Sequence, residues 1–160
     1  MLSRDTMKVH WLALLLVIGA ALTVPVVSAK IVEEKDGYIV MTGPDTLNVD
    51  SLNLRDMSLR SSSSISQGQS QWYATSVSSG NTAFYSGLNW GNPSNSLTLT
   101  IYAPDSLFGP YYDDVDGVID GWINVQITRT GGLTSGTWRS NVYGHSVTGS
   151  QSYTYSAYAV

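Results

Sequence analysis

Acidic side chains are concentrated in one short stretch of a weakly charged sequence. From Ser61 onward the chain has five of them, and four lie between Tyr111 and Gly121. These four are Asp113, Asp114, Asp116 and Asp120, and the fifth is Asp105. Carboxylates this close repel one another and raise each other's pKa unless a cation or hydrogen-bond donors neutralise them. The stretch therefore predicts a calcium site, in which Asp105 or backbone carbonyl groups complete the six to eight oxygen ligands that calcium prefers.

The spacing within this stretch partly matches an EF-hand-type calcium loop. Five residues stand at ligand or turn positions of such a loop: Asp114, Asp116, Gly117, Ile119 and Asp120. Tyr112 and Ile123 occupy the first and last positions, where acidic ligands normally stand. An affinity of ~10⁻⁴ to 10⁻³ M, as in extracellular modules, is expected. The alternative is a solvated turn in which Asp and Gly are present for their backbone conformations.

The chain offers few residues for catalysis. His145 is the only histidine after the apolar N-terminal run, no glutamate follows Glu34, and cysteine is absent. A Ser-His-Asp site would have to use His145, which has no nucleophile-elbow motif near it. Acids on one turn rarely face each other across a cleft, as glycoside hydrolysis requires. The residues favour a protein that is not an enzyme, with a hydrolase as the least favoured alternative.

Aromatic side chains are the second group of candidate functional residues, with five Trp and ten Tyr in the chain. The alternation of side chains along a strand places Tyr102, Trp122 and Tyr143 on outward faces, each next to an apolar residue that is expected to face the core. Such rings can stack on sugars or seat a protein partner. They can equally cover the sheet or pack on the N-terminal segment. The partners that this pattern predicts are an extracellular polysaccharide or protein, or a second copy of the chain.

The elements that must position these residues are strands. Six stretches have strand length and lie between turn residues: Gln71 to Val77, Thr82 to Trp90, Ser96 to Ala103, Trp122 to Thr128, Thr137 to Tyr143 and Gln151 to Ala159. In the third and fourth, apolar and polar residues alternate with a period of two. No helical period follows the N-terminal run. The pattern predicts an all-β, antiparallel, jelly-roll-like β-sandwich of six to eight strands.

The N-terminal third divides into two further segments. Residues 1–29 have the form of a signal peptide, since basic residues precede the apolar run Trp11 to Val24 and Val27-Ser28-Ala29 resembles a cleavage site. An uncleaved anchor is the alternative, and it is the one route by which we expect a membrane contact. Residues 30–60 are expected to be an N-terminal segment or linker, with a short strand at Tyr38 to Met41. The serine run from Ser61 to Ser64 marks the predicted start of the β-sandwich domain at residues 61–160.

Four short motifs carry a family resemblance. They are Ile65-x-Gln67-Gly68-Gln69-x-x-Trp72, Leu88-Asn89-Trp90, Leu97 to Asp105 and Gly136-Thr137-Trp138-x-x-x-Val142-Tyr143-Gly144. In order and spacing the chain from Ile65 to Tyr155 resembles the prokaryotic pre-peptidase C-terminal domain family, small β-sandwiches appended to secreted peptidases. The resemblance implies a non-catalytic accessory or adhesion module, stabilised by calcium in some relatives. Many members carry an Asp-x-Asp pair where this chain has Ser96 and Thr98, so a metal site on that strand is not implied here.

Length and net charge limit the classes of function and partner that the chain can have. The 160 residues are enough for one domain, and the net charge of −4 with a pI of about 4.8 argues against nucleic acid as a partner. Together these observations predict a secreted, extracellular and non-enzymatic module, stabilised by calcium, that binds a polymer or cell-surface partner. The alternative is a structural subunit of an extracellular sheath or filament.

Overall fold

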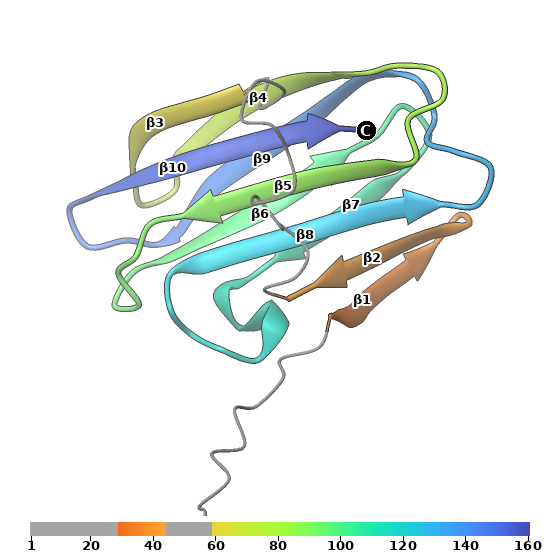
Figure 1. The fold of residues 1–160 in the computed structure, drawn as a ribbon. Coiled ribbons are helices and arrows are strands. Elements are labelled where there is room, and N and C mark those ends of the chain that lie inside the picture. The colour runs from red at the N-terminus through yellow and green to blue at the C-terminus, as the bar shows by residue number, and fades with distance from the viewer. Residues whose placement is uncertain (1–28, 44–58) are drawn as a thin grey trace, which may run out of the picture.

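The computed structural model describes residues 29–43 and 59–160, which form two antiparallel β-sheets packed face to face (Figure 1). The six-stranded sheet has the order β1-β2-β8-β5-β10-β3. Its strands are β1 (Lys30–Lys35), β2 (Tyr38–Thr42), β8 (Trp122–Arg129), β5 (Ala83–Asn89), β10 (Ser150–Ala159) and β3 (Leu59–Ser66). The four-stranded sheet has the order β4-β9-β6-β7. Its strands are β4 (Ser70–Val77), β9 (Gly136–Ser146), β6 (Ser96–Tyr102) and β7 (Leu107–Tyr111). The predicted all-β antiparallel sandwich is confirmed.

The core lies between the two sheets and follows the predicted alternation. Leu97, Leu99 and Ile101 of β6 are fully buried, as are Ile123, Val125 and Ile127 of β8. Trp138 of β9 fills the centre, with its ring centroid 4.7 Å from that of Phe84 and 6.1 Å from that of Phe108. A tilted or offset arrangement of aromatic rings at these distances is favourable. The outward faces of both sheets are thereby fixed, because neighbouring residues on a strand point to opposite sides.

The N-terminal segment differs from the expectation of a leader or linker. The predicted strand at Tyr38 to Met41 is confirmed as β2, but Lys30–Lys35 forms an additional strand, and together they extend the six-stranded sheet beside β8. The serine run is also not a break. Ser61 to Ser64 lies inside β3 and pairs with β10, so the expected domain boundary at Ser61 falls within a strand. The described residues form ten strands, of which eight follow residue 58.

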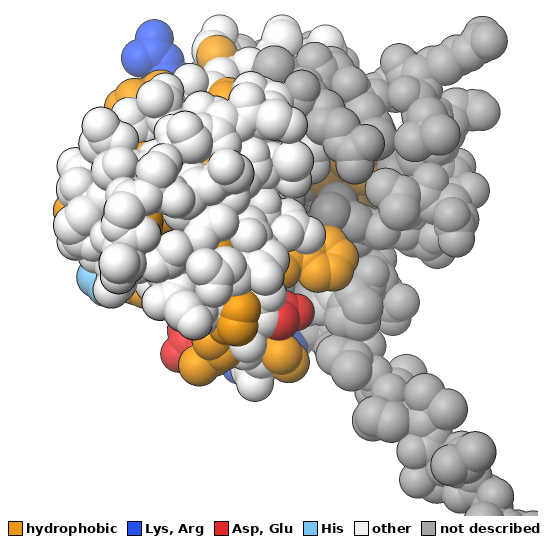
Figure 2. Space-filling model, turned by 90° about the vertical axis from the view of Figure 1, so that its left-hand side faces the viewer, with side chains coloured by type: hydrophobic (Ala, Val, Ile, Leu, Met, Phe, Trp, Pro, Cys, Tyr) orange, Lys and Arg blue, Asp and Glu red, His pale blue; other side chains and the backbone are white. Residues whose placement is uncertain are grey.

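The described surface is mostly uncharged. Figure 2 shows one end of the sandwich, where polar uncharged side chains and backbone dominate and acidic and hydrophobic side chains gather at the lower end. In Figure 1 the turn between β7 and β8 lies at this lower end. Within the described part of the chain, no helix reaches the length and hydropathy that a membrane crossing requires. The predicted signal peptide lies in residues 1–28 and Ala29, almost wholly outside the described residues, and stays a prediction.

Candidate functional site

Two exposed aromatic rings touch on the outer face of the four-stranded sheet. Trp72 of β4 is 54% exposed and Tyr102 of β6 is 38% exposed, and their ring centroids lie 5.2 Å apart. Tyr143 of β9 lies half-buried on the same face, since its neighbour Val142 is fully buried in the core. We call Trp72, Tyr102 and Tyr143 the aromatic strip. Sequence reasoning placed Tyr102 and Tyr143 outward but missed Trp72, although its place five residues before the buried Val77 puts it on the outer face.

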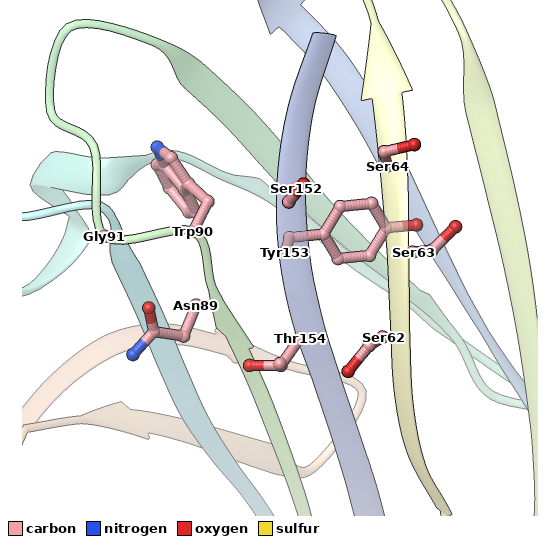
Figure 3. Close-up of a pocket in the computed structure, with 9 residues that line it drawn as sticks. All are labelled: Ser62, Ser63, Ser64, Asn89, Trp90, Gly91, Ser152, Tyr153 and Thr154. Atoms are coloured by element: carbon pink, nitrogen blue, oxygen red, sulfur yellow. The ribbon is translucent and has the colours of Figure 1, made fainter.

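Trp122, the third predicted binding residue, lies on the opposite side of the molecule. It is 38% exposed on the outer face of the six-stranded sheet, where β8 begins. Beside this strand lies an open groove of about 740 Å³ over β3, β5 and β10. Figure 3 shows residues that line it: Ser62, Ser63, Ser64, Asn89, Trp90, Gly91, Ser152, Tyr153 and Thr154. The lining is hydroxyl, amide, aromatic and backbone, with no charged side chain among the described residues. The structure therefore separates Trp122 from Tyr102 and Tyr143.

The acidic turn is built around Asp113, which is buried. Asp113–Asp116 forms one turn of 3-10 helix, and Gly117 ends it in the left-handed region at φ 96°. One carboxylate oxygen of Asp113 accepts hydrogen bonds from the backbone N–H groups of Gly121 at 2.9 Å, Trp122 at 3.1 Å and Asp120 at 3.3 Å. Backbone donors thus satisfy a carboxylate that the sequence assigned to calcium.

Gly121 packs tightly against the backbone of the loop that follows β5. It has a φ of 81°, and a Cβ atom there would lie 2.7 Å from the backbone nitrogen of Asn92. Its carbonyl group accepts hydrogen bonds from the N–H groups of Trp90 and Gly91. Only glycine tolerates both the positive φ and this close approach. The turn is therefore locked to the start of β8 and to the end of β5.

Three carboxylates of the turn remain for a cation: Asp114, Asp116 and Asp120. Asp116 accepts a hydrogen bond from the Val118 N–H at 2.9 Å. Burial, followed by the negative charges of Asp116 and Asp113, raises the pKa of Asp120. Among the described residues, no three His, Cys, Asp or Glu side chains are gathered in an arrangement that could hold a metal ion. The turn is thus rich in oxygen donors but is not a preformed cage, and calcium binding stays a prediction.

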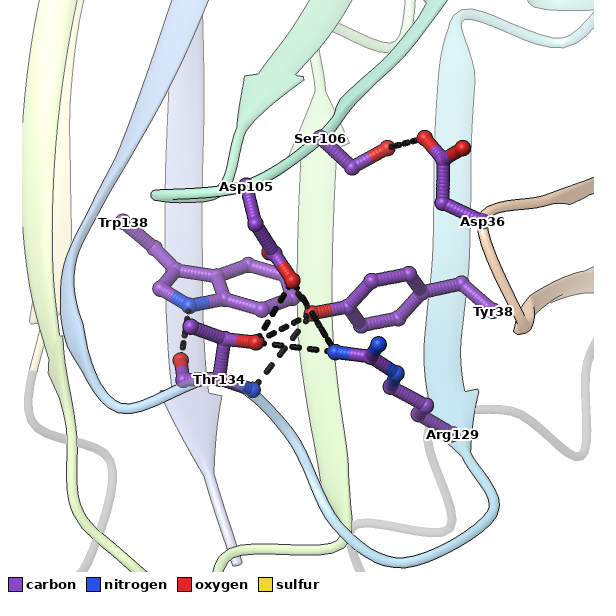
Figure 4. Close-up of polar contacts among 7 residues, drawn as sticks. All are labelled: Asp36, Tyr38, Asp105, Ser106, Arg129, Thr134 and Trp138. Atoms are coloured by element: carbon purple, nitrogen blue, oxygen red, sulfur yellow. Dashed lines mark hydrogen bonds and ion pairs between the residues drawn. The ribbon is translucent and has the colours of Figure 1, made fainter.

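Asp105, the fifth predicted ligand, belongs to a different network. Its carboxylate pairs with the Arg129 guanidinium at 2.9 Å and accepts hydrogen bonds from Thr134 Oγ1 at 2.7 Å and Tyr38 Oη at 2.9 Å (Figure 4). Asp105 follows the end of β6, whereas Asp113 and Asp114 line a pocket with Ser96 at the start of that strand. Seven strand residues span roughly 20 Å. Asp105 therefore does not join the acidic turn, and its role is to connect three segments of the fold.

His145 lies in a smaller pocket beside the acidic turn. This pocket has a volume of about 360 Å³ and brings His145 near Ser96 and Asp114. The imidazole packs edge-on against the Tyr112 ring with centroids 5.1 Å apart. In the part of the chain that the structure describes, no hydrogen bond joins its side chain to Ser96 or Asp114. The contacts needed to activate a serine are therefore not assembled in this geometry.

Comparison with known proteins finds a partial likeness. No protein-family model matches the chain. A stretch of 41 residues is 56% identical to an uncharacterized protein from Archaeoglobus fulgidus, and it makes up 26% of this chain. The chain spans about half the length of that relative, 56% of it. The likeness is too short to show a family, and the resemblance to pre-peptidase C-terminal domains stays an expectation from sequence.

Proposed function

We propose that this protein is a secreted, non-catalytic β-sandwich module that binds an extracellular polymer or a cell-surface partner. The observation that supports the proposal most directly is the aromatic strip, where the rings of Trp72 and Tyr102 are in contact and exposed on a sheet face. Rings held on a rigid sheet supply a large contact area and lose little side-chain entropy on binding. The sequence resemblance to non-catalytic pre-peptidase C-terminal domains points the same way.

The surroundings of the strip suit an extended and weakly charged partner. Leu107, which pairs with Tyr102 across β6 and β7, is 40% exposed and continues the apolar surface. Arg139 pairs with Tyr102 on the other side and provides one cation. Exposed aromatic and apolar side chains beside an arginine are typical of a contact in which aromatic side chains provide most of the binding energy.

Binding by the purified full chain to insoluble polymers and to whole cells tests this proposal. We expect the protein to co-sediment with collagen fibrils or bacterial cells, and the double variant Trp72→Ala with Tyr102→Ala to bind about tenfold more weakly. Ile31→Ala is the control, because it removes a similarly exposed apolar side chain from the other sheet. Co-sedimentation that does not change in the double variant would exclude the aromatic strip as the binding site.

Stabilisation by calcium is the second part of the proposal. Asp114, Asp116 and Asp120 supply the oxygen atoms, and a bound cation would relieve the repulsion among them. With 10 mM calcium and a dissociation constant of ~10⁻⁴ to 10⁻³ M, the free energy of unfolding should rise by roughly 1.4 to 2.7 kcal/mol. Replacing Asp116 and Asp120 by Asn should abolish the rise. Equal thermal melting in calcium and in chelator would contradict this part alone.

A structural subunit of a sheath or filament is the alternative, and two long edge strands among the described residues favour it. β3 and β4 each have eight residues and form an edge of their respective sheets. Unpaired edge strands can pair with another copy. Size-exclusion chromatography over a hundredfold range of concentration separates the two functions. A persistent monomer would rule against the alternative, whereas growth into long assemblies would favour it.

A further inference from the structure

A row of four exposed side chains crosses the outer face of the six-stranded sheet. Trp122 of β8 is paired with Asn89 of β5, Asn89 with Thr154 of β10, and Thr154 with Ser62 of β3. All four side chains are exposed. Strands lie about 4.8 Å apart, so the row extends over roughly 14 Å. It places an aromatic ring at one end and amide and hydroxyl groups along the rest.

Three residues of the row, Asn89, Thr154 and Ser62, line the open groove described above, and Trp122 lies beside it on the neighbouring strand. Figure 3 shows Asn89, Thr154 and Ser62 at one level of three neighbouring strands, with Ser152 and Ser64 one level further along. Ser152 and Ser64 are themselves paired across β10 and β3. The serine run, which the sequence suggested was a break between domains, thus supplies a line of hydroxyl groups on the groove.

The hydrogen-bonding groups in the row are available to a ligand. Within the described residues, no side chain or backbone group is hydrogen-bonded to the amide of Asn89 or to the hydroxyl of Thr154. An amide offers two donors and one acceptor oxygen, and each hydroxyl offers one donor and acceptor lone pairs. Since Asn89 and Thr154 lie on inner strands of the sheet, their positions are fixed before a ligand arrives, which lowers the entropic cost of binding.

We propose that this groove binds a neutral polysaccharide. A sugar ring presents hydroxyl groups that both donate and accept, and an apolar C–H face that packs on an aromatic ring such as Trp122. A polyanion would need Lys or Arg in the groove to neutralise it, and the described lining has neither. A compact apolar ligand would need an enclosed apolar pocket, whereas this groove is open and lined by hydroxyl and amide groups as well as by aromatic rings. An extended chain of sugars matches its length, its shape and the uncharged side chains of its described lining.

This site is separate from the aromatic strip and does not rest on the function proposed for it. The strip lies on the outer face of the four-stranded sheet, and the groove lies on the outer face of the six-stranded sheet. Binding at either surface can therefore be removed without changing the other. This separation makes Trp72→Ala the control for the groove.

Electrophoresis of the purified full chain through native gels that contain a soluble polysaccharide tests the proposal. The neutral polymers are hydroxyethyl cellulose, galactomannan and dextran, and polygalacturonate is the anionic comparison. We expect at least one neutral polymer to retard the protein and polygalacturonate to leave it unretarded. Trp122→Ala should raise the apparent dissociation constant about tenfold, and Asn89→Ala and Thr154→Val several-fold each.

Trp72→Ala is the control and should leave this retardation unchanged. Thermal melting of each variant shows whether it is folded, and Asn89→Ala and Thr154→Val test the groove independently if Trp122→Ala unfolds. Absence of retardation in all three neutral polymers would overturn the proposal, as would retardation by polygalacturonate alone. Retardation that Trp72→Ala abolishes and Trp122→Ala preserves would also overturn it, and would instead favour the aromatic strip as the polysaccharide site.

Discussion

Asp113 is the residue on which the acidic turn depends. Its buried carboxylate accepts hydrogen bonds from three backbone N–H groups. Asp113→Ala would leave these donors without a partner, and we expect a loss of about 2 kcal/mol in the free energy of unfolding. Asp114→Ala, at an exposed neighbouring position, should change it by less than about 0.5 kcal/mol. Urea denaturation measures both, and similar losses for the two variants would contradict this role for Asp113.

The sequence predicted the crowding of these carboxylates but not how each is neutralised. Residue type and spacing show that Asp113, Asp114, Asp116 and Asp120 lie on one turn. They do not show that the chain folds back so that the N–H groups after Ile119 reach Asp113. The sequence suggests Asp105 as a residue that completes the calcium ligands, yet its partner Arg129 is 24 residues away in sequence. Hydrogen-bond partners that are distant in sequence cannot be read from local spacing.

Asp105 makes the stability of the fold depend on pH in the acidic range. Burial opposes ionisation of this carboxyl, but hydrogen bonds from Thr134 and Tyr38 and the charge of Arg129 lower its pKa overall. A lowered pKa stabilises the fold at neutral pH, and this contribution is lost as the pH falls below about 4 and through the folded-state pKa. The side chain is a third exposed, so we expect this contribution to the free energy of unfolding to be less than about 1 kcal/mol.

Asp105→Asn should be less stable than the wild type at pH 7, and this difference in stability should shrink at pH 3. A difference that is constant from pH 7 to 3 would contradict the assignment.

At the scale of elements, the hairpin of β1 and β2 closes one side of the sandwich. Glu33 of β1 accepts hydrogen bonds from the Tyr111 hydroxyl at 2.7 Å and the Gly109 N–H at 3.1 Å, which connects it to β7 of the other sheet. Burial and the hydrogen bond to Glu33 raise the pKa of Tyr111. Tyr38 of β2 also packs against Phe108, with ring centroids 5.1 Å apart. The hairpin therefore joins the edges of both sheets.

Tyr38→Ala tests whether the hairpin is part of the folded unit. Tyr38 is 1% exposed, and Arg129 lies over its ring at 4.6 Å. Removing a fully buried ring from a core typically costs about 3 to 5 kcal/mol, and we expect a loss in this range. Ile31→Ala, at a position 52% exposed on the same hairpin, should cost less than about 0.5 kcal/mol. Hydrogen exchange of the β2 amides should accelerate in the first variant alone. Unchanged stability would show that the sandwich folds without the hairpin.

The strands that sequence analysis missed share one property. β1, β3 and β7 all form an edge of a sheet. An edge strand has one neighbour, so it needs less apolar alternation than a central strand, and it tolerates a proline such as Pro110. β3 is largely serine, and Ile65 is its one core residue among the described side chains. The six predicted strands lie between turn residues, and in β6 and β8 burial of one face also enforces the period of two.

At the scale of the whole molecule, the two proposed binding surfaces lie on opposite sides of the sandwich. The aromatic strip and the open groove beside Trp122 are separated by both sheets and the core between them. If both proposals hold, one molecule can contact two partners at once. Such a bridge raises apparent affinity through effective concentration when both partners are on one surface. A variant that lacks both Trp72 and Trp122 should then lose more binding to whole cells than the sum of the single losses predicts.

Buried tyrosines determine how the stability of the fold changes at alkaline pH. Burial raises the pKa of Tyr155, which also bonds with Ser86, to about 12, and burial and the neighbouring Tyr85 raise the pKa of Tyr158 to about 12. In the unfolded chain both groups ionise near pH 10. A raised pKa stabilises the fold fully below pH 10, and this contribution is lost as the pH rises towards 12. For Tyr155 the loss in the free energy of unfolding should be about 2 kcal/mol, measured by denaturation at each pH together with the ultraviolet absorbance of tyrosinate.

Tyr155→Phe should be less stable than the wild type at pH 8, because the Ser86 hydroxyl loses its partner, but it should lose less stability between pH 10 and 12. Parallel curves for the two proteins would show that this phenol does not carry the alkaline transition.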